Sequence, residues 1–355
     1  SWMFLSSYQS MREKHLRERT LSCMVHMGNG VMGIAFGTAA TVFFGNHIDS
    51  YCGDFSKVNA ADLNIDERPN NFSHGNTGGR KIEIDNFSKI PGSPLAYWAS
   101  DDLLSVFSKH RQIYETSISE GQNITANNEK FLRYFWELDS SRIGIGNKWV
   151  FYSKGGSFRK WYGNIDFVID WSQDARDEYR KNSSARIIPE KLWFREGVTW
   201  TLVTSSDRSF RLLPDVATFD KTGSSIFFES KSDLKKALLF LNSNVCEKLL
   251  DIFNSTVSLQ VDDVRKLPFD PHASDVPENN FDSLYLSAKR DWDDFESSWD
   301  FSEISFIVKN DGNMTLKKSW EIWAEEKCLE IAKVKEIEEE TNHYFISTYG
   351  LQNEL

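Results

Sequence analysis

The pattern of apolar and polar positions predicts a chain built from both helices and strands. Residues 5–19 have the charge density and apolar spacing of an amphipathic helix. Residues 21–27 then form an apolar run typical of a strand, and residues 165–171 alternate apolar and polar as a half-buried strand does. Residues 192–201 predict a further core strand that ends in a glycine turn.

Longer helical patterns follow in the second half of the chain. Residues 232–254 place a row of apolar side chains on one helix face, with Ser232 positioned to cap the amino end. Residues 319–342 form another helical pattern, with enough apolar positions to pack on a neighbouring element. Strands and helices in this arrangement predict an α+β fold. The apolar face of the helix predicted over residues 232–254 comprises Leu234, Leu238, Leu241, Val245 and Leu249.

Composition is that of a soluble globular protein with room for two or three domains. The chain has 355 residues, of which 40% are hydrophobic and 26% charged, with a formal net charge of −11. Its four cysteines are widely spaced without a C-x-x-C pair, which indicates a reducing cytoplasm and no structural zinc. No apolar run reaches transmembrane length, so no membrane partner is expected. Because the chain opens inside an apolar run at Ser1, we expect a piece of a larger protein.

One stretch departs from this acidic background. Residues 130–164 contain ten aromatic, seven basic and two acidic residues in 35 positions, which gives a local charge of +5. Interleaved rings and cations are typical of nucleic-acid binding, because cations meet phosphates while rings stack on bases. The alternative is a run of sheet-forming aromatic residues whose outward positions happen to be Lys and Arg.

The order of residues within the stretch favours the binding interpretation. Residues 153–156, Ser-Lys-Gly-Gly, predict a turn that lets a ligand or a second backbone come close. Residues 157–164 then set two cations against two large rings before a Gly-Asn turn.

Several runs resemble the target-recognition region of large bacterial adenine-specific DNA methyltransferases. The central ones are FLRYFWE at residues 131–137 and KGGSFRKWYGN at residues 154–164. Similar runs are IPGSPLAYW at 90–98, which joins the catalytic and recognition modules in that family, FREGVTW at 194–200 and DWDDFESSWDF at 291–301. The resemblance covers nearly the whole chain and is to the BREX phage-defence methyltransferases (PglX-like) and the fused Type IIG restriction-modification enzymes.

The resemblance also implies that the chemistry lies outside this chain. Methyltransferases of this family use a [DNS]-P-P-[YFW] tetrapeptide, and the chain has no Pro-Pro pair. Its G-x-G-x-x-G sequence at residues 28–33 is followed by residues 34–44, which predict a strand and not a phosphate-facing helix. We therefore expect no catalytic and no cofactor-binding residue here, with S-adenosylmethionine bound elsewhere in the parent protein. At Ala126 and Asn127 the chain departs from the Gly-Asp pair of the family.

Resemblance and composition together divide the chain into three expected parts. Residues 1–105 would hold the tail of a Rossmann-like methyltransferase sheet and a connector, of which the polar residues 59–89 are expected to be mobile. Residues 106–270 would form a mixed α/β DNA target-recognition domain. Residues 271–355 would form an acidic, helical spacer segment.

The region after the recognition domain is strongly acidic. Residues 262–303 carry twelve acidic and four basic residues, so this region should not face phosphates. The crowded carboxylates of residues 291–301 raise the question of a metal site. No histidine joins them, and we expect helix-capping acids and buried rings there, with no metal.

The sequence thus predicts a fragment of a site-specific DNA adenine-N6 methyltransferase that supplies target recognition and is inactive alone. Its partner would be double-stranded DNA, with cations on phosphates or guanine edges and Asn164 on an adenine edge. Trp161 or Tyr162 could instead belong to the core. The predicted DNA contacts are Arg133, Lys148, Lys154, Arg159, Lys160, Trp161, Tyr162 and Asn164.

Two other functions stay open at this point. A protein-interaction scaffold of a defence complex would bind other defence-system proteins through the acidic carboxyl-terminal half. A sugar-binding module would stack exposed aromatic side chains on pyranose rings. The surplus of cations around the rings counts against the sugar-binding alternative.

Overall fold

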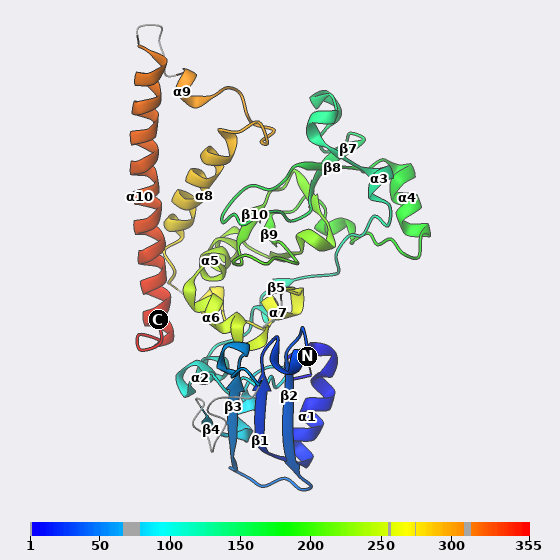
Figure 1. The fold of residues 1–355 in the computed structure, drawn as a ribbon. Helices are drawn as coiled ribbons and strands as arrows, with labels where there is room; N and C mark the ends of the chain where they lie inside the picture. The colour runs from blue at the N-terminus through cyan, green and yellow to red at the C-terminus, as the bar shows by residue number, and fades with distance from the viewer. Residues whose placement is uncertain (1, 67–78, 255–256, 274, 309–313) are drawn as a thin grey trace. The chain divides into compact units, whose positions relative to one another are not determined.

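The computed structural model describes residues 2–66, 79–254, 257–273, 275–308 and 314–355. The chain divides into two compact units (Figure 1). The first comprises residues 1–111 with 249–255, and the second comprises residues 112–248 with 256–355. Each unit has its own sheet structure.

The first unit is built on a four-stranded sheet of order β2-β1-β3-β4. Strand β1 is antiparallel to β2 and parallel to β3, and β4 is antiparallel to β3. The predicted helix and strand at the amino end are confirmed, although the α-helix is shorter than residues 5–19. The elements are α1 (Gln9–Glu18), β1 (Thr20–Met27), β2 (Thr38–Phe44), β3 (Cys52–Val58), β4 (Arg80–Glu83) and α2 (Asp101–Lys109).

The G-x-G-x-x-G sequence forms the connection between β1 and β2, across which Met27 pairs with Thr38 in an antiparallel hairpin. Gly30 and Gly33 have φ angles of 82° and 67°, which glycine adopts at little cost. The loop leads into a strand, as the sequence predicts. The loop itself contains a three-residue 3-10 turn, Val31–Gly33.

The connector predicted over residues 59–89 is in part folded, which corrects the expectation of a mobile segment. Strand β4 pairs with β3, and the 3-10 turn after it buries Ile84 and Phe87. These few apolar residues within a polar run were too sparse to show a periodicity. Residues 67–78 of the connector lie outside the described residues.

The second unit contains two four-stranded sheets, of order β10-β9-β12-β5 and β11-β7-β8-β6. In the latter, β8 is antiparallel to both β7 and β6, and β11 is parallel to β7. The strand predicted over residues 165–171 is confirmed as β8. The prediction for residues 192–201 is wrong in part, because β9 begins at Gly197 and no strand precedes that glycine in this range. The strands are β5 (Ser117–Ile118), β6 (Leu132–Tyr134), β7 (Trp149–Ser153), β8 (Phe167–Asp170), β9 (Gly197–Trp200), β10 (Phe210–Leu213), β11 (Ala217–Phe219) and β12 (Ser225–Phe228).

The single helix predicted over residues 232–254 is in fact two helices, α5 (Lys231–Leu241) and α6 (Asn244–Phe253). The break follows from Asn242, whose side chain bonds to both the backbone N–H and the carbonyl of Phe210, each at 3.0 Å. The capping residue is Ser230 and not Ser232, because the Ser230 hydroxyl accepts the backbone N–H of Asp233 at 3.0 Å. The predicted α+β class is confirmed.

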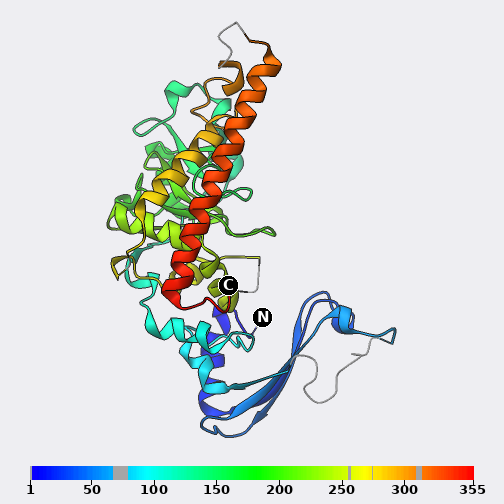
Figure 2. The same cartoon turned by 90° about the vertical axis from the view of Figure 1, so that its left-hand side faces the viewer.

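Two long helices, α8 (Glu278–Asp293) and α10 (Leu316–Tyr349), run side by side along the second unit (Figures 1 and 2). The short helix α9 (Ser305–Val308) packs against α10. The remaining helices are α3 (Asn128–Phe131), α4 (Gln173–Lys181) and α7 (Val261–Arg265). Helix α10 extends beyond residues 319–342, and Trp320, Leu329 and Ile331, which were expected to pack, are exposed. No helix in the described ranges is long and apolar enough to span a membrane.

Candidate nucleic-acid interface

The eight predicted contact residues lie in three places of the second unit. Lys154 enters the interior beside Asp220, and residues 159–164 lie beneath α8 and α10. Arg133 lies on the edge strand β6 of the β11-β7-β8-β6 sheet, and Lys148 immediately precedes its inner strand β7.

Lys154 neutralises a buried carboxylate. Its ammonium nitrogen lies 3.4 Å from Oδ2 of Asp220, and both side chains are largely buried. Asp220 also accepts the Tyr152 hydroxyl at 2.9 Å and the backbone N–H of Thr222 at 2.8 Å. Burial, followed by the charge of Asp220, raises the pKa of Tyr152 well above its ordinary value, so the phenol remains a donor. The structure therefore gives Lys154 an internal partner.

The Gly-Gly turn admits a second backbone, one of the two possibilities that the sequence raised. Gly155 has a φ angle of 81°, and a Cβ atom there would lie 2.9 Å from the carbonyl oxygen of Thr222. A Cβ atom at Gly223 would lie 2.7 Å from the nitrogen of Gly155. The two segments thus cross with no room for a methyl group at either glycine.

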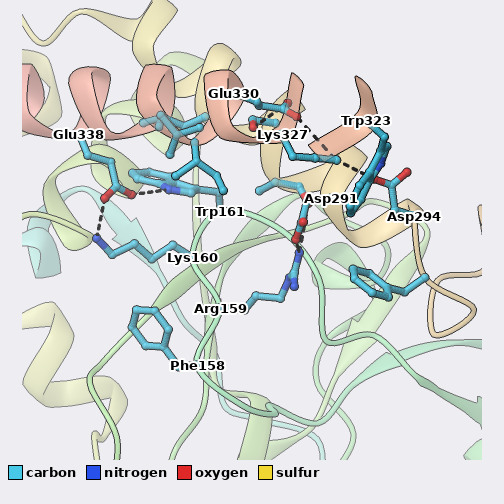
Figure 3. Close-up of a pocket in the computed structure, with 16 residues that line it drawn as sticks. Phe158, Arg159, Lys160, Trp161, Asp291, Asp294, Trp323, Lys327, Glu330 and Glu338 are labelled. Carbon is cyan, nitrogen blue, oxygen red and sulfur yellow. Dashed lines mark hydrogen bonds and ion pairs between the residues drawn. The ribbon is translucent and has the colours of Figure 1, made fainter. Parts of the chain in front are cut away.

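Arg159 and Lys160 face the two acidic helices (Figure 3). The Arg159 guanidinium pairs with the carboxylate of Asp291 on α8. The Lys160 ammonium lies 3.3 Å from Oε2 of Glu338 on α10. Both cations are therefore neutralised within the unit by residues more than a hundred positions away in the sequence.

The two rings and the amide of the same segment are buried. Trp161 is 4% exposed, and Tyr162 and Asn164 are similarly covered. The indole N–H of Trp161 donates to Oε1 of Glu338 at 2.9 Å, and the Asn164 amide donates to the Ser157 carbonyl at 2.7 Å. Trp161 has a φ angle of 70°, which is unfavourable for a bulky residue and persists because its backbone bonds to β10 on both sides. This burial favours the core interpretation for Trp161 and Tyr162.

Arg133 and Lys148 converge on the ring of Trp149. Cζ of Arg133 lies 5.8 Å from the ring centroid, and Nζ of Lys148 lies 5.4 Å from it. Lys148 is half exposed and pairs with Asp170 at 3.2 Å. Arg133 donates to the carbonyl of Glu129 at 2.8 Å. Arg133 therefore stands on the edge strand β6, and Lys148, which is open to solvent, stands at the start of the inner strand β7.

Sequence reasoning missed the exposed rings of the same stretch. Tyr134 stacks between Trp136 and Phe167, with centroid separations of 4.5 and 4.6 Å. Trp136 ends this three-ring stack and is 54% exposed. Because Tyr134 and Arg133 are consecutive on β6, the ring stack and Arg133 flank opposite faces of the edge strand. The FLRYFWE run contains these rings, but a sequence gives no sign of which aromatic positions remain uncovered.

The expectation for residues 291–301 is wrong in part. Trp292 is buried as predicted, but Phe295 is more than half exposed. The acids lie at the carboxyl end of α8, where they cannot cap a helix N-terminus. They pair with cations instead, as Asp294 does with Lys327 at 2.7 Å.

Two relatives of the chain are adenine-specific methyltransferases. It is 31% identical over 388 residues to the adenine-specific methyltransferase PglX of Lacticaseibacillus casei (strain Zhang), which covers 100% of the chain and 32% of that protein. It is 32% identical over 328 residues to the adenine-specific methyltransferase BrxX of Escherichia coli O9:H4 (strain HS), which covers 88% of the chain and 26% of that protein. The chain is related to the PglX and BrxX methyltransferases. The resemblance noted from the sequence is thereby confirmed.

The chain spans about a third of the length of PglX and about a quarter of that of BrxX. No family model matches it. Among solved structures, the Type IIL restriction-modification enzyme MmeI in complex with DNA matches 97% of the chain and 45% of its own, with a TM-score of 0.46 and 10% identity. That likeness is too low to bear on the fold or the site.

Proposed function

We propose that this chain supplies DNA target recognition to a larger adenine-specific DNA methyltransferase of a phage-defence or restriction-modification system. The parent would transfer a methyl group from S-adenosylmethionine to N6 of an adenine flipped out of double-stranded DNA. The observation that carries the proposal is full-length similarity to adenine-specific methyltransferases about three times longer. The chain itself has no Pro-Pro tetrapeptide, so the methyl-transfer chemistry is assigned to the remainder of the parent.

We propose the β6 edge as the DNA-facing part of the second unit. Arg133 lies on one face of the strand, and the exposed stack of Tyr134 and Trp136 lies on the other. Half-exposed Lys148, at the start of the inner strand β7, approaches the same Trp149 ring as Arg133 and adds a second cation. Cations of this kind hold phosphates and fix the position of the protein on the duplex. A strand edge flanked in this way suits entry into a groove, as β-ribbon proteins do.

Within this proposal, the other six predicted residues support the recognition segment from inside. Lys154, Arg159 and Lys160 have carboxylate partners, and Trp161, Tyr162 and Asn164 are buried. The first unit would carry the end of the methyltransferase sheet, and the parent would act in the cytoplasm.

Salt-dependent binding of duplex DNA tests the proposal. If Lys148 contacts a phosphate, Lys148→Ala should flatten the slope of log K against log salt concentration by about 0.9, since one counterion fewer is released. Fluorescence anisotropy of a labelled duplex from 50 to 200 mM NaCl would measure the slope. The control is Lys317→Ala on α10, where the lysine is highly exposed. Equal slopes for both variants and the parent sequence would remove Lys148 from the interface.

The exposed ring stack gives a second test. Trp136→Ala should weaken duplex binding by about 1–3 kcal/mol if a base or sugar packs on the ring, while thermal stability stays nearly constant. Trp136→Phe should retain much of the affinity because it keeps a ring. Trp320→Ala is the matched control, since Trp320 is 52% exposed but lies on the acidic helix α10. Loss of affinity in the Trp320 variant alone would place the interface elsewhere.

A further inference from the structure

An apolar groove runs between residues 158–161 and the helices α8 and α10. Its main cavity has a volume of about 580 Å³ and is lined by Trp161, Leu284, Trp323 and Val334, among others (Figure 3). A second cavity of about 440 Å³ adjoins it and shares Asp294, Phe295 and Trp323. The groove therefore offers two neighbouring pockets for bulky side chains.

The groove and its surroundings expose several large apolar side chains. Phe158, Phe295 and Ile331 line the main cavity and are each about half exposed or more. Along α10, residues Leu316, Trp320, Trp323, Ile331 and Val334 fall within one face at 100° per residue.

Charge decides which class of molecule the groove suits. The two cavities are lined by three cations and five carboxylates, a net charge of −2, the carboxylates being those of Asp291, Asp294, Glu296, Glu330 and Glu338. The three cations that line the main cavity, Arg159, Lys160 and Lys327, all have carboxylate partners. The groove therefore repels nucleic acid and favours an apolar molecule with basic flanks.

We propose that this groove binds an amphipathic helix of a protein partner, with two bulky apolar side chains in the two cavities and Lys or Arg residues along its flanks. A helix presents apolar anchors at i, i+3, i+4 and i+7, which suits two adjoining pockets between helices. This role is distinct from DNA recognition and uses a different part of the second unit from the β6 edge.

A designed helical peptide tests the groove directly. The probe is a fluorescein-labelled 20-residue peptide of Leu and Lys with apolar positions on one helix face, and its control is a scrambled peptide of the same composition. We expect saturable binding of the patterned peptide at 0.5 M NaCl, where bare charge attraction is screened, at least about tenfold tighter than the scrambled peptide.

Two variants of α10 locate the binding. Ile331 and Leu329 are 66% and 67% exposed, and they point about 160° apart around the helix. Ile331→Asp should weaken peptide binding at least about tenfold, whereas Leu329→Asp should leave it unchanged, and both should leave duplex binding unchanged. Equal effects of the two variants, or no preference for the patterned peptide, would overturn the proposal. Self-association of the chain that Ile331→Asp abolishes in analytical ultracentrifugation would also overturn it, by making a second copy the occupant.

Discussion

Trp161→Ala should lower the free energy of unfolding of the second unit by about 3–5 kcal/mol. The ring is 4% exposed, contacts Phe281 edge-on at a centroid distance of 6.4 Å, and donates its N–H to Glu338. Its removal would open a cavity between the recognition segment and α10 and would leave the Glu338 carboxylate with one donor fewer. Urea denaturation followed by circular dichroism would measure the change.

The exposed ring of Trp136 provides the control for this prediction. Trp136→Ala removes the same side chain from the same stretch but should change the free energy of unfolding by no more than about 0.5 kcal/mol. The two variants therefore separate a structural tryptophan from a surface one. A Trp161→Ala protein that unfolds at the same urea concentration as its parent would contradict the burial seen in the structure.

Asp220→Ala should be about as damaging, with a loss of about 3–5 kcal/mol, because it leaves a largely buried ammonium without a counter-charge. Lys154 and the Tyr152 hydroxyl would both lose their acceptor. Asp220→Asn should cost less, since its one amide oxygen still accepts from either Tyr152 or the N–H of Thr222, which bond to different oxygens of Asp220. Differential scanning calorimetry of the two variants would measure this order.

A surface carboxylate serves as the comparison. Asp177 on α4 pairs with Arg180 at 3.0 Å, and both side chains are well exposed. Asp177→Ala should therefore cost at most about 1 kcal/mol. If Asp220→Ala were no more destabilising than Asp177→Ala, the Lys154 cluster would not be a structural core of the unit.

Local patterns predicted many of the elements, because they depend on neighbouring residues. The strands near residues 21–27 and 165–171 and the helices at both ends of the chain follow from apolar spacing alone. The break after α5 could not be predicted in this way. It depends on Asn242 bonding to the backbone of Phe210, a contact that links positions 32 apart.

The candidate site shows the same limit more clearly. Composition identified residues 130–164 as a dense set of rings and cations. It did not show that Trp161 is buried and Trp136 is exposed. Their difference is made by Glu338 and α10, which cover one ring and leave the other exposed. Arg159 and Lys160 likewise form ion pairs with acidic residues of α8 and α10. No local sequence pattern shows that these two helices pack against residues 159 and 160.

The crossing at Gly155 and Gly223 sets the boundaries for exchanging parts of this region between relatives. Each glycine packs against the backbone of the other segment. A Cβ atom added at Gly223 would lie 2.7 Å from the nitrogen of Gly155. If a transplanted loop contains only one of the two crossing segments, it would pack against a backbone whose conformation fits a different segment. Chimeras should therefore exchange residues 149–223 as one block, and libraries that vary the exposed loop after β6 can leave the crossing untouched.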